Sequence, residues 1–179
     1  VSTSVKVTLV HDGVRVAGFD SLDAALADPA LADAATGAVD GIVHRVVHGG
    51  ERTEPVVIDE AEVAELTRLI ELAPLHQPPA LDALAACRAA RPDLVQVACF
   101  DTAFHATLPE AARTYALPER LRATVRVYGF HGLSHSWSAR RALEEAPDAR
   151  RVLVAHLGGG QSLCGVLDGR RGKTTMGFT

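Results

Sequence analysis

Three residues that can do chemistry follow strand-like segments of the sequence. Asp101 comes directly after LVQVACF, His131 follows VRVYGF, and His156 closes RVLVAH. Because ligands of an open α/β sheet bind beyond the carboxyl ends of its strands, we expect these three side chains to converge. A carboxylate beside two imidazoles could orient a substrate or transfer a proton. Asp101 could equally be a turn residue or a cap, so its position alone leaves both roles open.

A fourth candidate, Arg45, lies in the strand-like segment GIVHRVVH, residues 41–48. The strand period of two places Arg45 on the same face as Val47. A guanidinium beside an apolar side chain suits a small carboxylate with a short alkyl tail. Any amphipathic edge strand shows the same pattern, so the pairing alone fits both interpretations.

The segment HLGGG, His156 to Gly160, lies between the strand-like runs RVLVAHL and QSLCGVLDG. Its glycines predict a tight strand-to-strand turn whose backbone N–H groups could bind phosphate. The segment is neither a P-loop, which needs GxxxxGK[ST] before a helix, nor a dinucleotide GxGxxG motif. Most glycine triplets are merely turns, so phosphate binding needs further support.

Other polar groups have structural explanations. His131 and His135 have the i, i+4 spacing of a metal pair, but the glycines around His131 argue against a continuous helix. Hydrogen-bonded structural imidazoles are therefore favoured over zinc ligands. Lys6 is expected within a strand and is most simply a solvated edge lysine. The cysteines lack CxxC spacing and lie among apolar residues, which favours buried thiols. No metal site is predicted.

The composition sets the limits for the class of protein. The chain has 179 residues, 47% of them hydrophobic, and a net charge of −4. It can form one compact domain, or one domain and part of another. The negative charge argues against nucleic-acid and membrane-surface binding, and no apolar run approaches the roughly 18 residues of a membrane span. A cytoplasmic protein is expected. The ends at Val1 and Thr179 suggest a fragment of a longer chain.

The elements that must position these residues follow from the periodicity, which switches between two and 3.6 and indicates an α/β domain. Strands are expected over residues 4–10, 14–19, 41–48, 94–100 and 123–130, and in the two runs around HLGGG. Helices are expected over residues 23–35 with a break at Pro29, from an N-cap at Asp59 toward Pro74, from Pro78 through Cys87, and over 134–145.

Six blocks of the sequence resemble the acetokinase family, the ATP-dependent short-chain carboxylate kinases that include the acetate kinases. They are HRVVHGGERTEPVVID, LAPLHQPPAL, FDTAFHATLPEAARTYALP, YGFHGLSH, HLGGGQSL and TTMGFT, in the family's order and spacing. The resemblance implies the ribonuclease H-like, actin-like (ASKHA) kinase fold, truncated after the start of its second domain. It implies an N-terminal acetokinase domain over residues 1–149 and the opening hairpin of the nucleotide-binding domain over 150–179.

The resemblance also implies roles for particular residues. Asp101 would be the catalytic acid commonly assigned to proton transfer, and His131 would stabilise the transition state. Arg45 would contact the carboxylate and the phosphoryl group. The wall of the alkyl pocket would be formed by Val47, Leu75 and Phe130. The ATP-binding residues would be Lys6, His156, Leu157, Gly158, Gly159 and Gly160.

The implied reaction is reversible transfer of the γ-phosphoryl group of ATP to acetate, giving acetyl phosphate and ADP. Mg²⁺ would accompany ATP, and the complete protein would be a homodimer. Because acetate, with a pKa near ~4, is already ionised at neutral pH, it needs no general base. We therefore expect Asp101 to orient Arg45, a water or the magnesium shell. Propionate or another short-chain carboxylate is an alternative substrate, and a noncatalytic half-protein is an alternative outside the enzymes.

The chain departs from the family pattern at several positions. Gly159 stands where the family usually has Asn, Leu133 replaces a usual Thr, and Lys173 replaces a usual Asp. The family's N-terminal asparagine would precede Val1, while its metal-supporting glutamate and second arginine belong to a later part of the chain. These differences allow a divergent paralogue, and we expect the 179-residue chain by itself to be inactive.

Overall fold

Three β-sheets and the helices packed on them make up the part of the chain that the structure describes. The computed structural model describes residues 6–29, 39–122, 125–168 and 170–177. The strands are β1 (Val7–His11), β2 (Val14–Phe19), β3 (Gly41–Val46), β4 (Val56–Val57), β5 (Val95–Phe100), β6 (Arg151–Leu157), β7 (Gln161–Leu167) and β8 (Arg170–Thr174). The α-helices are α1 (Leu22–Leu26), α3 (Glu60–Arg68), α4 (Gln77–Ala90), α5 (Glu110–Arg113), α6 (Glu119–Arg122) and α7 (Gly132–Glu145), with 3₁₀ turns η2 (Leu69–Leu72) and η3 (Ala103–His105). The expected mixture of strands and helices is confirmed.

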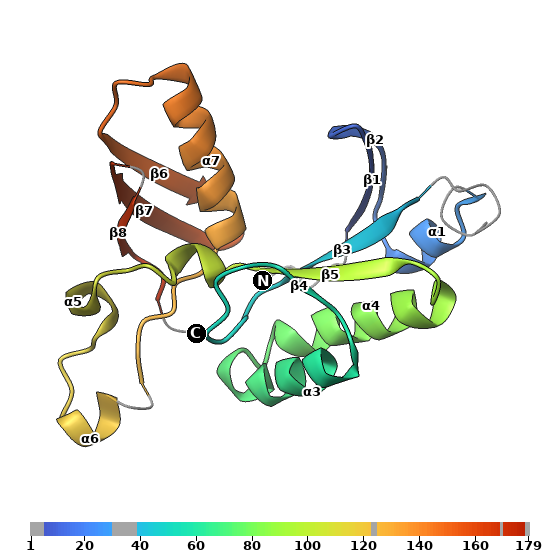
Figure 1. Ribbon diagram of the computed structural model, residues 1–179, viewed down its shortest axis with the longest axis horizontal. Helices are drawn as coiled ribbons and strands as arrows, with labels where there is room; N and C mark the ends of the chain where they lie inside the picture. The colour runs from blue at the N-terminus through green and yellow to red at the C-terminus, as the bar shows by residue number, and fades with distance from the viewer. Residues whose placement is uncertain (1–5, 30–38, 123–124, 169, 178–179) are drawn as a thin grey trace.

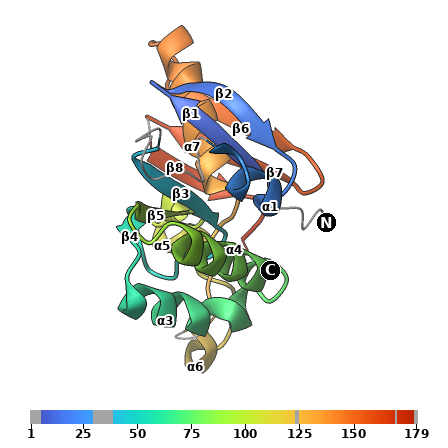
Figure 2. The ribbon, with the colours of Figure 1, turned by 90° about the vertical axis from the view of Figure 1, so that its right-hand side faces the viewer.

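The sheets have the strand orders β1-β2, β3-β5-β4 and β6-β7-β8. The β6-β7-β8 sheet and α7 lie at one end of the molecule and α3 and α4 at the other, with β3 and β5 between them (Figures 1 and 2). The chain therefore brings the ends of β5 and β6 and the beginning of α7 toward the middle of the molecule.

The N-terminal hairpin forms where the alternating sequence predicts it. β1 and β2 pair antiparallel, and the turn residues Asp12 and Gly13 both have positive φ, at 48° and 77°. Asp-Gly suits this hairpin turn because both central residues need the left-handed region. Lys6 lies just before β1, so its expected place inside the strand is wrong by one position.

The first expected helix is shorter than the sequence suggested. α1 begins after Ser21, whose hydroxyl accepts a hydrogen bond from the Ala24 N–H at 3.1 Å, and it ends at Leu26. The expectation of a helix from Asp23 is therefore wrong by one residue at its start. Residues 30–35 of the same expectation lie outside the described residues.

The central sheet carries the larger apolar core. β3 runs parallel to β5, and β4 pairs antiparallel with β5. The core residues shared by this sheet, α3 and α4 are Val46, Ile58, Leu66, Leu84, Ala98 and Phe100. The predicted N-cap of α3 is confirmed, because Asp59 accepts from the Glu62 N–H at 2.7 Å. α4 begins with prolines in its first turn, where a missing N–H costs nothing.

β3 ends two residues earlier than the expected strand over 41–48. The chain turns at His48 to Gly50, where Gly50 has a φ of 63° and donates its N–H to His48 Nδ1 at 3.1 Å. This local hydrogen bond replaces the strand ladder, so the predicted strand was too long.

The C-terminal sheet is covered by a helix on one face. α7 and η3 pack on β6 and β7 through Phe104, Ala139, Val154, Cys164 and Val166. The outward side chains of the two strands include the exposed leucines 153, 157, 163 and 167. The predicted hairpin around HLGGG is confirmed as β6 and β7. β8 was not predicted, because RRGK lacks an alternating apolar pattern.

The strand expected over residues 123–130 is wrong. The described residues 125–130 contain only an isolated bridge between Arg126 and Thr114, although Tyr128 and Phe130 donate their N–H groups to carbonyls of residues 177 and 176. Gly129 has a φ of 84°, which lies outside the β region and interrupts a regular ladder.

Candidate functional site

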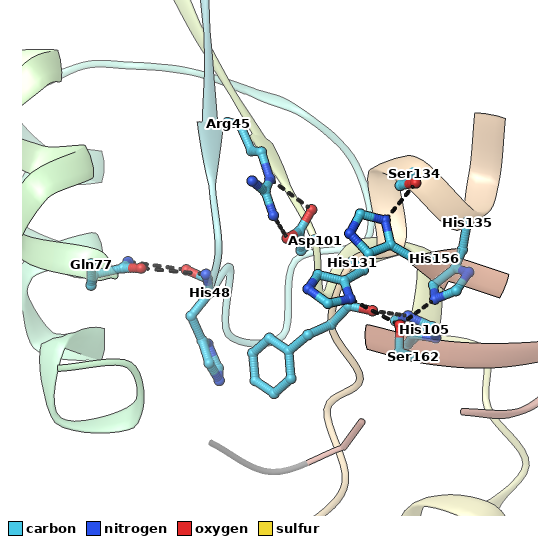
Figure 3. Close-up of polar contacts among 11 residues, drawn as sticks. Arg45, His48, Gln77, Asp101, His105, His131, Ser134, His135, His156 and Ser162 are labelled. Atoms are coloured by element: carbon cyan, nitrogen blue, oxygen red, sulfur yellow. Dashed lines mark hydrogen bonds and ion pairs between the residues drawn. The ribbon is translucent and has the colours of Figure 1, made fainter. Parts of the chain in front are cut away.

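An ion pair joins the ends of two neighbouring parallel strands. Arg45, in β3, donates from Nε and Nη2 to the two carboxylate oxygens of Asp101, at 3.3 and 2.6 Å (Figure 3). The Asp101 side chain is 1% exposed, whereas the Arg45 side chain is 58% exposed. The hydrogen bonds that Arg45 donates to Asp101 raise the pKa of the Arg45 guanidinium. The carboxylate therefore fixes one edge of the guanidinium and leaves its other N–H groups for a ligand.

A cavity of about 800 Å³ opens beside Arg45, between the β1-β2 hairpin, the edge strand β3 and the start of α4. Val47 and Leu75 line it together with Arg45 and His76. Arg45 and Val47, which the sequence predicts on one strand face, thus both line this cavity. The guanidinium and the apolar side chains can receive a carboxylate and its alkyl tail.

The described structure also gives the surroundings of two further predicted site residues. Lys6, predicted to bind ATP, lines the cavity of Arg45, and none of the described lining residues belongs to the HLGGG turn. Phe130, predicted to wall the alkyl pocket, is 3% exposed and is not among the described lining residues. Its ring instead lies 5.9 Å from the ring of His48.

The HGG turn after β3 is held by buried polar groups. Gln77 accepts from the His48 N–H at 3.3 Å and donates to the His48 carbonyl at 3.1 Å (Figure 3). Thr102 accepts from the Gly49 N–H at 3.0 Å. Burial, and the positive charge of Arg126, lower the pKa of His48 to about 4, so its ring is neutral near pH 7. These contacts fix the segment that follows Arg45 and β3.

The backbone before α7 approaches the end of β5 very closely. His131 has a φ of 57°, and a Cβ built on Gly132 would lie 1.9 Å from the carbonyl oxygen of Asp101. Only glycine allows this approach. The left-handed conformation costs a non-glycine residue roughly 1 kcal/mol, and His is among the side chains that adopt it more often. The strained turn places the His131 ring beside the Asp101 end of β5.

Four histidines gather where α7 meets the β6-β7 hairpin. The rings of His131 and His156 stack at a centroid distance of 4.0 Å, and those of His105 and His135 lie 5.9 Å apart. His156 Nδ1 lies 2.9 Å from Ser134 Oγ, in the first turn of α7. Nδ1 of His131 and Nε2 of His135 each lie 2.8 Å from Ser162 Oγ (Figure 3). Two of the three predicted strand-end residues, His131 and His156, are therefore in direct contact.

The environment favours neutral rings at His131 and His135. Burial lowers the pKa of His135 to about 4, with a further contribution from His105. Burial and His156 also lower the pKa of His131, while the charge of Asp101 acts in the opposite direction. In the part of the chain that the structure describes, no group of three or more His, Cys, Asp or Glu side chains could hold a metal. The imidazoles of His131 and His135 are therefore suited to donate and accept hydrogen bonds.

The HLGGG turn is open to solvent on one side and touches a histidine on the other. Gly158 donates its N–H to the Gly160 carbonyl at 3.2 Å, which closes the turn. A Cβ on Gly159 would meet no atom within 4 Å, whereas one on Gly160 would lie 3.2 Å from Cε1 and Nε2 of His131. Leu157 is 76% exposed. The turn thus offers backbone groups to a ligand next to the Nε2 edge of His131.

Comparison with known proteins gives the family. The profile described as Acetokinase family matches residues 11–179. The chain belongs to the acetokinase family. It is 50% identical to the acetate kinase of Streptomyces coelicolor over 144 residues, which cover 77% of this chain and 35% of that protein. It is 46% identical to the acetate kinase of Stutzerimonas stutzeri over 176 residues, which cover 94% of this chain and 44% of that one.

Solved acetokinase structures agree with the fold. A propionate kinase from Francisella tularensis superposes with a TM-score of 0.78 at 37% identity, covering 87% of this chain and 41% of that one. An acetate kinase from Porphyromonas gingivalis gives 0.76 at 34% identity, covering 94% and 46%. The ASKHA kinase fold is thus confirmed for this portion, and the chain spans less than half the length of these relatives.

Two positioning residues of this acetokinase chain escaped the sequence reasoning. Gln77 opens α4 and shows no periodic signal that would reveal its contact with the HGG turn. Ser162 did leave a signal, because it shares the strand period of Cys164 and Val166 and therefore lies on the apolar face of β7. A polar residue on a buried face needs a partner, which His131, just before α7, and His135, within it, provide.

Proposed function

We propose that this chain forms the N-terminal, carboxylate-binding part of a kinase that transfers the γ-phosphoryl group of ATP to a short-chain carboxylate. Acetate is the favoured substrate, with acetyl phosphate and ADP as products. The observation that carries the proposal is the Arg45–Asp101 pair at a cavity also lined by Val47 and Leu75. As in the sequence prediction, we divide the chain near residue 149 into this part and the start of the nucleotide-binding domain.

Arg45 would bind the carboxylate and later the developing acyl phosphate. An arginine suits this role because its planar fork meets carboxylate and phosphate oxygens bidentately. Asp101 accepts both contacts of Arg45 and is buried, which favours a positioning role over proton abstraction. No proton has to leave an ionised carboxylate before it attacks phosphorus. Val47 and Leu75 would contact the alkyl group and exclude water from it.

The second half of the site would receive the phosphates of ATP. Phosphoryl transfer depends on positioning and charge neutralisation, since its transition state is loose. His131 would donate a hydrogen bond to the transferred group, and the N–H groups of the HLGGG turn would contact the neighbouring phosphates. Lys6 would approach ATP only if the nucleotide reached the Arg45 cavity, so its role stays a prediction.

Mg²⁺ would enter as the Mg–ATP complex, as substrate. Both carboxylate oxygens of Asp101 are already engaged by Arg45, and the described residues contain no cluster of metal ligands. These residues do not fit a resident ion, so no step is assigned to one here. Among the described helices none is both long and apolar enough to cross a membrane. Homodimer assembly and a cytoplasmic location stay predictions from the family resemblance.

Propionate is the second candidate, because the cavity of about 800 Å³ has room beyond a methyl group. The test is acyl-phosphate formation, trapped as hydroxamate, by the complete protein with ATP and acetate, propionate or butyrate. We expect turnover, with the highest kcat/KM for acetate. A higher kcat/KM for propionate would assign propionate as the preferred substrate. No turnover with any of the three carboxylates would reject the kinase proposal. The 179-residue chain alone should give none, because it spans under half of its relatives.

A further inference from the structure

Ser162 links two histidines through one hydroxyl group. Its Oγ lies 2.8 Å from Nδ1 of His131 and 2.8 Å from Nε2 of His135, and the residue is 3% exposed. A serine hydroxyl has a single proton, so it can donate to only one of the two rings. The other ring must then donate to the serine oxygen. The tautomers of His131 and His135 are therefore coupled, and two arrangements are consistent with the distances.

The surroundings of His135 determine which of the two pairs of tautomers is favoured. Its Nδ1 is buried and has no hydrogen-bond partner among the described residues. A proton on Nδ1 would create a buried unpaired N–H, which is rarer and more costly in proteins than an unpaired acceptor. The proton therefore belongs on Nε2 of His135, which donates to Ser162. Ser162 in turn donates to Nδ1 of His131, and the His131 proton lies on Nε2.

The Nε2 edge of His131 lies at the HLGGG turn. A Cβ on Gly160 would be 3.2 Å from this nitrogen, and the ring of His156 stacks on the face of the imidazole at 4.0 Å between centroids. We propose that Ser162, itself oriented by His135, is a positioning residue that holds His131 in the Nε2–H tautomer and so directs a neutral donor at the turn. That a phosphoryl oxygen is the acceptor rests on the proposed function; the tautomer does not.

The first experiment measures the tautomer directly. Histidines of the complete protein are labelled with ¹⁵N, and two-bond ¹H–¹⁵N correlations distinguish Nδ1–H from Nε2–H rings. His131→Gln and His135→Gln identify the two signals. We expect both rings to carry the proton on Nε2 at pH 7. A proton on Nδ1 of His131 in the unsubstituted protein would overturn the proposal, whether or not the protein is a kinase.

The second experiment removes the link. Ser162→Ala should change His131 to a mixture of tautomers, while Ser162→Thr, which keeps the hydroxyl, should retain Nε2–H. Ser134→Ala removes the comparable hydroxyl beside His156 and should leave the His131 tautomer unchanged, which makes it the matched control. An unchanged Nε2–H signal in Ser162→Ala would show that another group sets the tautomer, and would also overturn the proposal.

Kinetics give a readout that a structural role would not move. In Ser162→Ala we expect kcat to fall about tenfold while KM for the carboxylate changes less than about twofold, because only a donor to the transferred group is lost. Ser162→Thr should recover most of kcat, and the exposed Ser136→Ala should match the unsubstituted protein. Equal changes in KM and kcat would contradict the role. If both rings carry the proton on Nε2 but the complete protein has no kinase activity, the proposed function is rejected and the positioning role of Ser162 still holds.

Discussion

The two halves of the site use different chemistry to present hydrogen-bond donors. At the ends of β3 and β5, Arg45 is held by a buried carboxylate and carries a charge at any physiological pH. At the meeting of α7 with β6 and β7, the rings of His131 and His135 have lowered pKa values and are held by a serine hydroxyl. The first half can bind an anion by charge, and the second can act only through neutral, directed hydrogen bonds.

The difference explains why the two halves need different support. A guanidinium has donors on every edge, so one carboxylate is enough to orient it. A neutral imidazole has one donor and one acceptor, and the wrong tautomer presents a lone pair in place of an N–H. The histidine half therefore needs a chain of partners, from His135 through Ser162 to His131. Four changes would test this contrast.

The largest effect is expected from the charged half. Arg45→Ala should lower kcat/KM for the carboxylate by roughly 10³-fold or more in the complete protein, because the proposed charged contact with the substrate is lost. It should also reduce the free energy of unfolding by about 1–3 kcal/mol, since Asp101 loses its partner while buried. Steady-state kinetics and urea unfolding measure the two losses.

Two further variants separate these losses. Asp101→Asn added to Arg45→Ala should restore stability without restoring activity. Arg150 makes a similar two-point contact with Asp168 at an exposed position, where solvent screens the pair, so Arg150→Ala should leave the free energy of unfolding and the kinetics nearly unchanged. Near-normal kcat/KM in Arg45→Ala would remove Arg45 from the site.

The histidine half can be disturbed through the turn that touches it. Gly160→Ala places a methyl group 3.2 Å from the His131 ring, so we expect kcat to fall by about ten- to thirtyfold as the ring is displaced. Gly159→Ala is the matched control, because its Cβ meets no atom within 4 Å, and its effect should be several times smaller. Equal effects at the two positions would show that the turn, and not its contact with His131, matters.

The apolar side of the charged half should control chain length. Val47→Ala enlarges the cavity beside Arg45 and should shift the ratio of kcat/KM values from acetate toward propionate or butyrate by about tenfold, since one methylene is worth about 1–3 kcal/mol. Leu75→Ala should act in the same direction. The exposed Val57→Ala, on β4, serves as the control. Constant ratios across the series would place Val47 outside the substrate pocket.

The smallest effect concerns stability and pH. The pKa values of His48 and His135 are lowered from 6.5 to about 4 in the folded protein. As the pH falls from 6.5 toward 4, the two histidines take up protons in the unfolded chain but not in the folded chain. Their contribution to the free energy of unfolding is therefore complete above pH 6.5 and is lost as the pH falls toward 4. We expect Tm to fall by on the order of 10 °C, measured by calorimetry.

Matched variants assign this fall in Tm. Replacing both residues, as His48→Gln with His135→Gln, should make the fall between pH 6.5 and 4 shallower. His11→Gln, at a side chain that is 80% exposed, should leave the slope unchanged. The same slope in all three proteins would show that other groups cause the acid sensitivity.

The sequence predicted most elements because their signals are local. The Asp59 cap, the prolines that open α4 and the glycine turn after β6 each depend on neighbours within a few residues. The family was predicted from long motifs and is confirmed. The strand expected over 123–130 failed because the positive φ of Gly129 cannot be recognised from an alternating pattern alone.

The site was predicted only in part, because several of its contacts join residues that are far apart in the sequence. Asp101, His131 and His156 were expected near one another from their positions after strand-like runs, and two of them stack. The contact of Asp101 with Arg45 joins residues 56 positions apart, and that of Ser162 with His131 joins residues 31 apart. Such contacts depend on the register of β3 with β5 and the placement of α7, which no local pattern specifies.

Gly132 makes the two halves of the site a single mechanical unit. Its missing side chain lets the first turn of α7 touch the main chain at Asp101, where any Cβ would clash at 1.9 Å from the carbonyl oxygen. The spacing between the charged and the neutral half is therefore set by main-chain atoms and is independent of side-chain rotamers. Substrate specificity can evolve by exchanging the side chains on either side of this contact, while residue 132 itself has no freedom to vary.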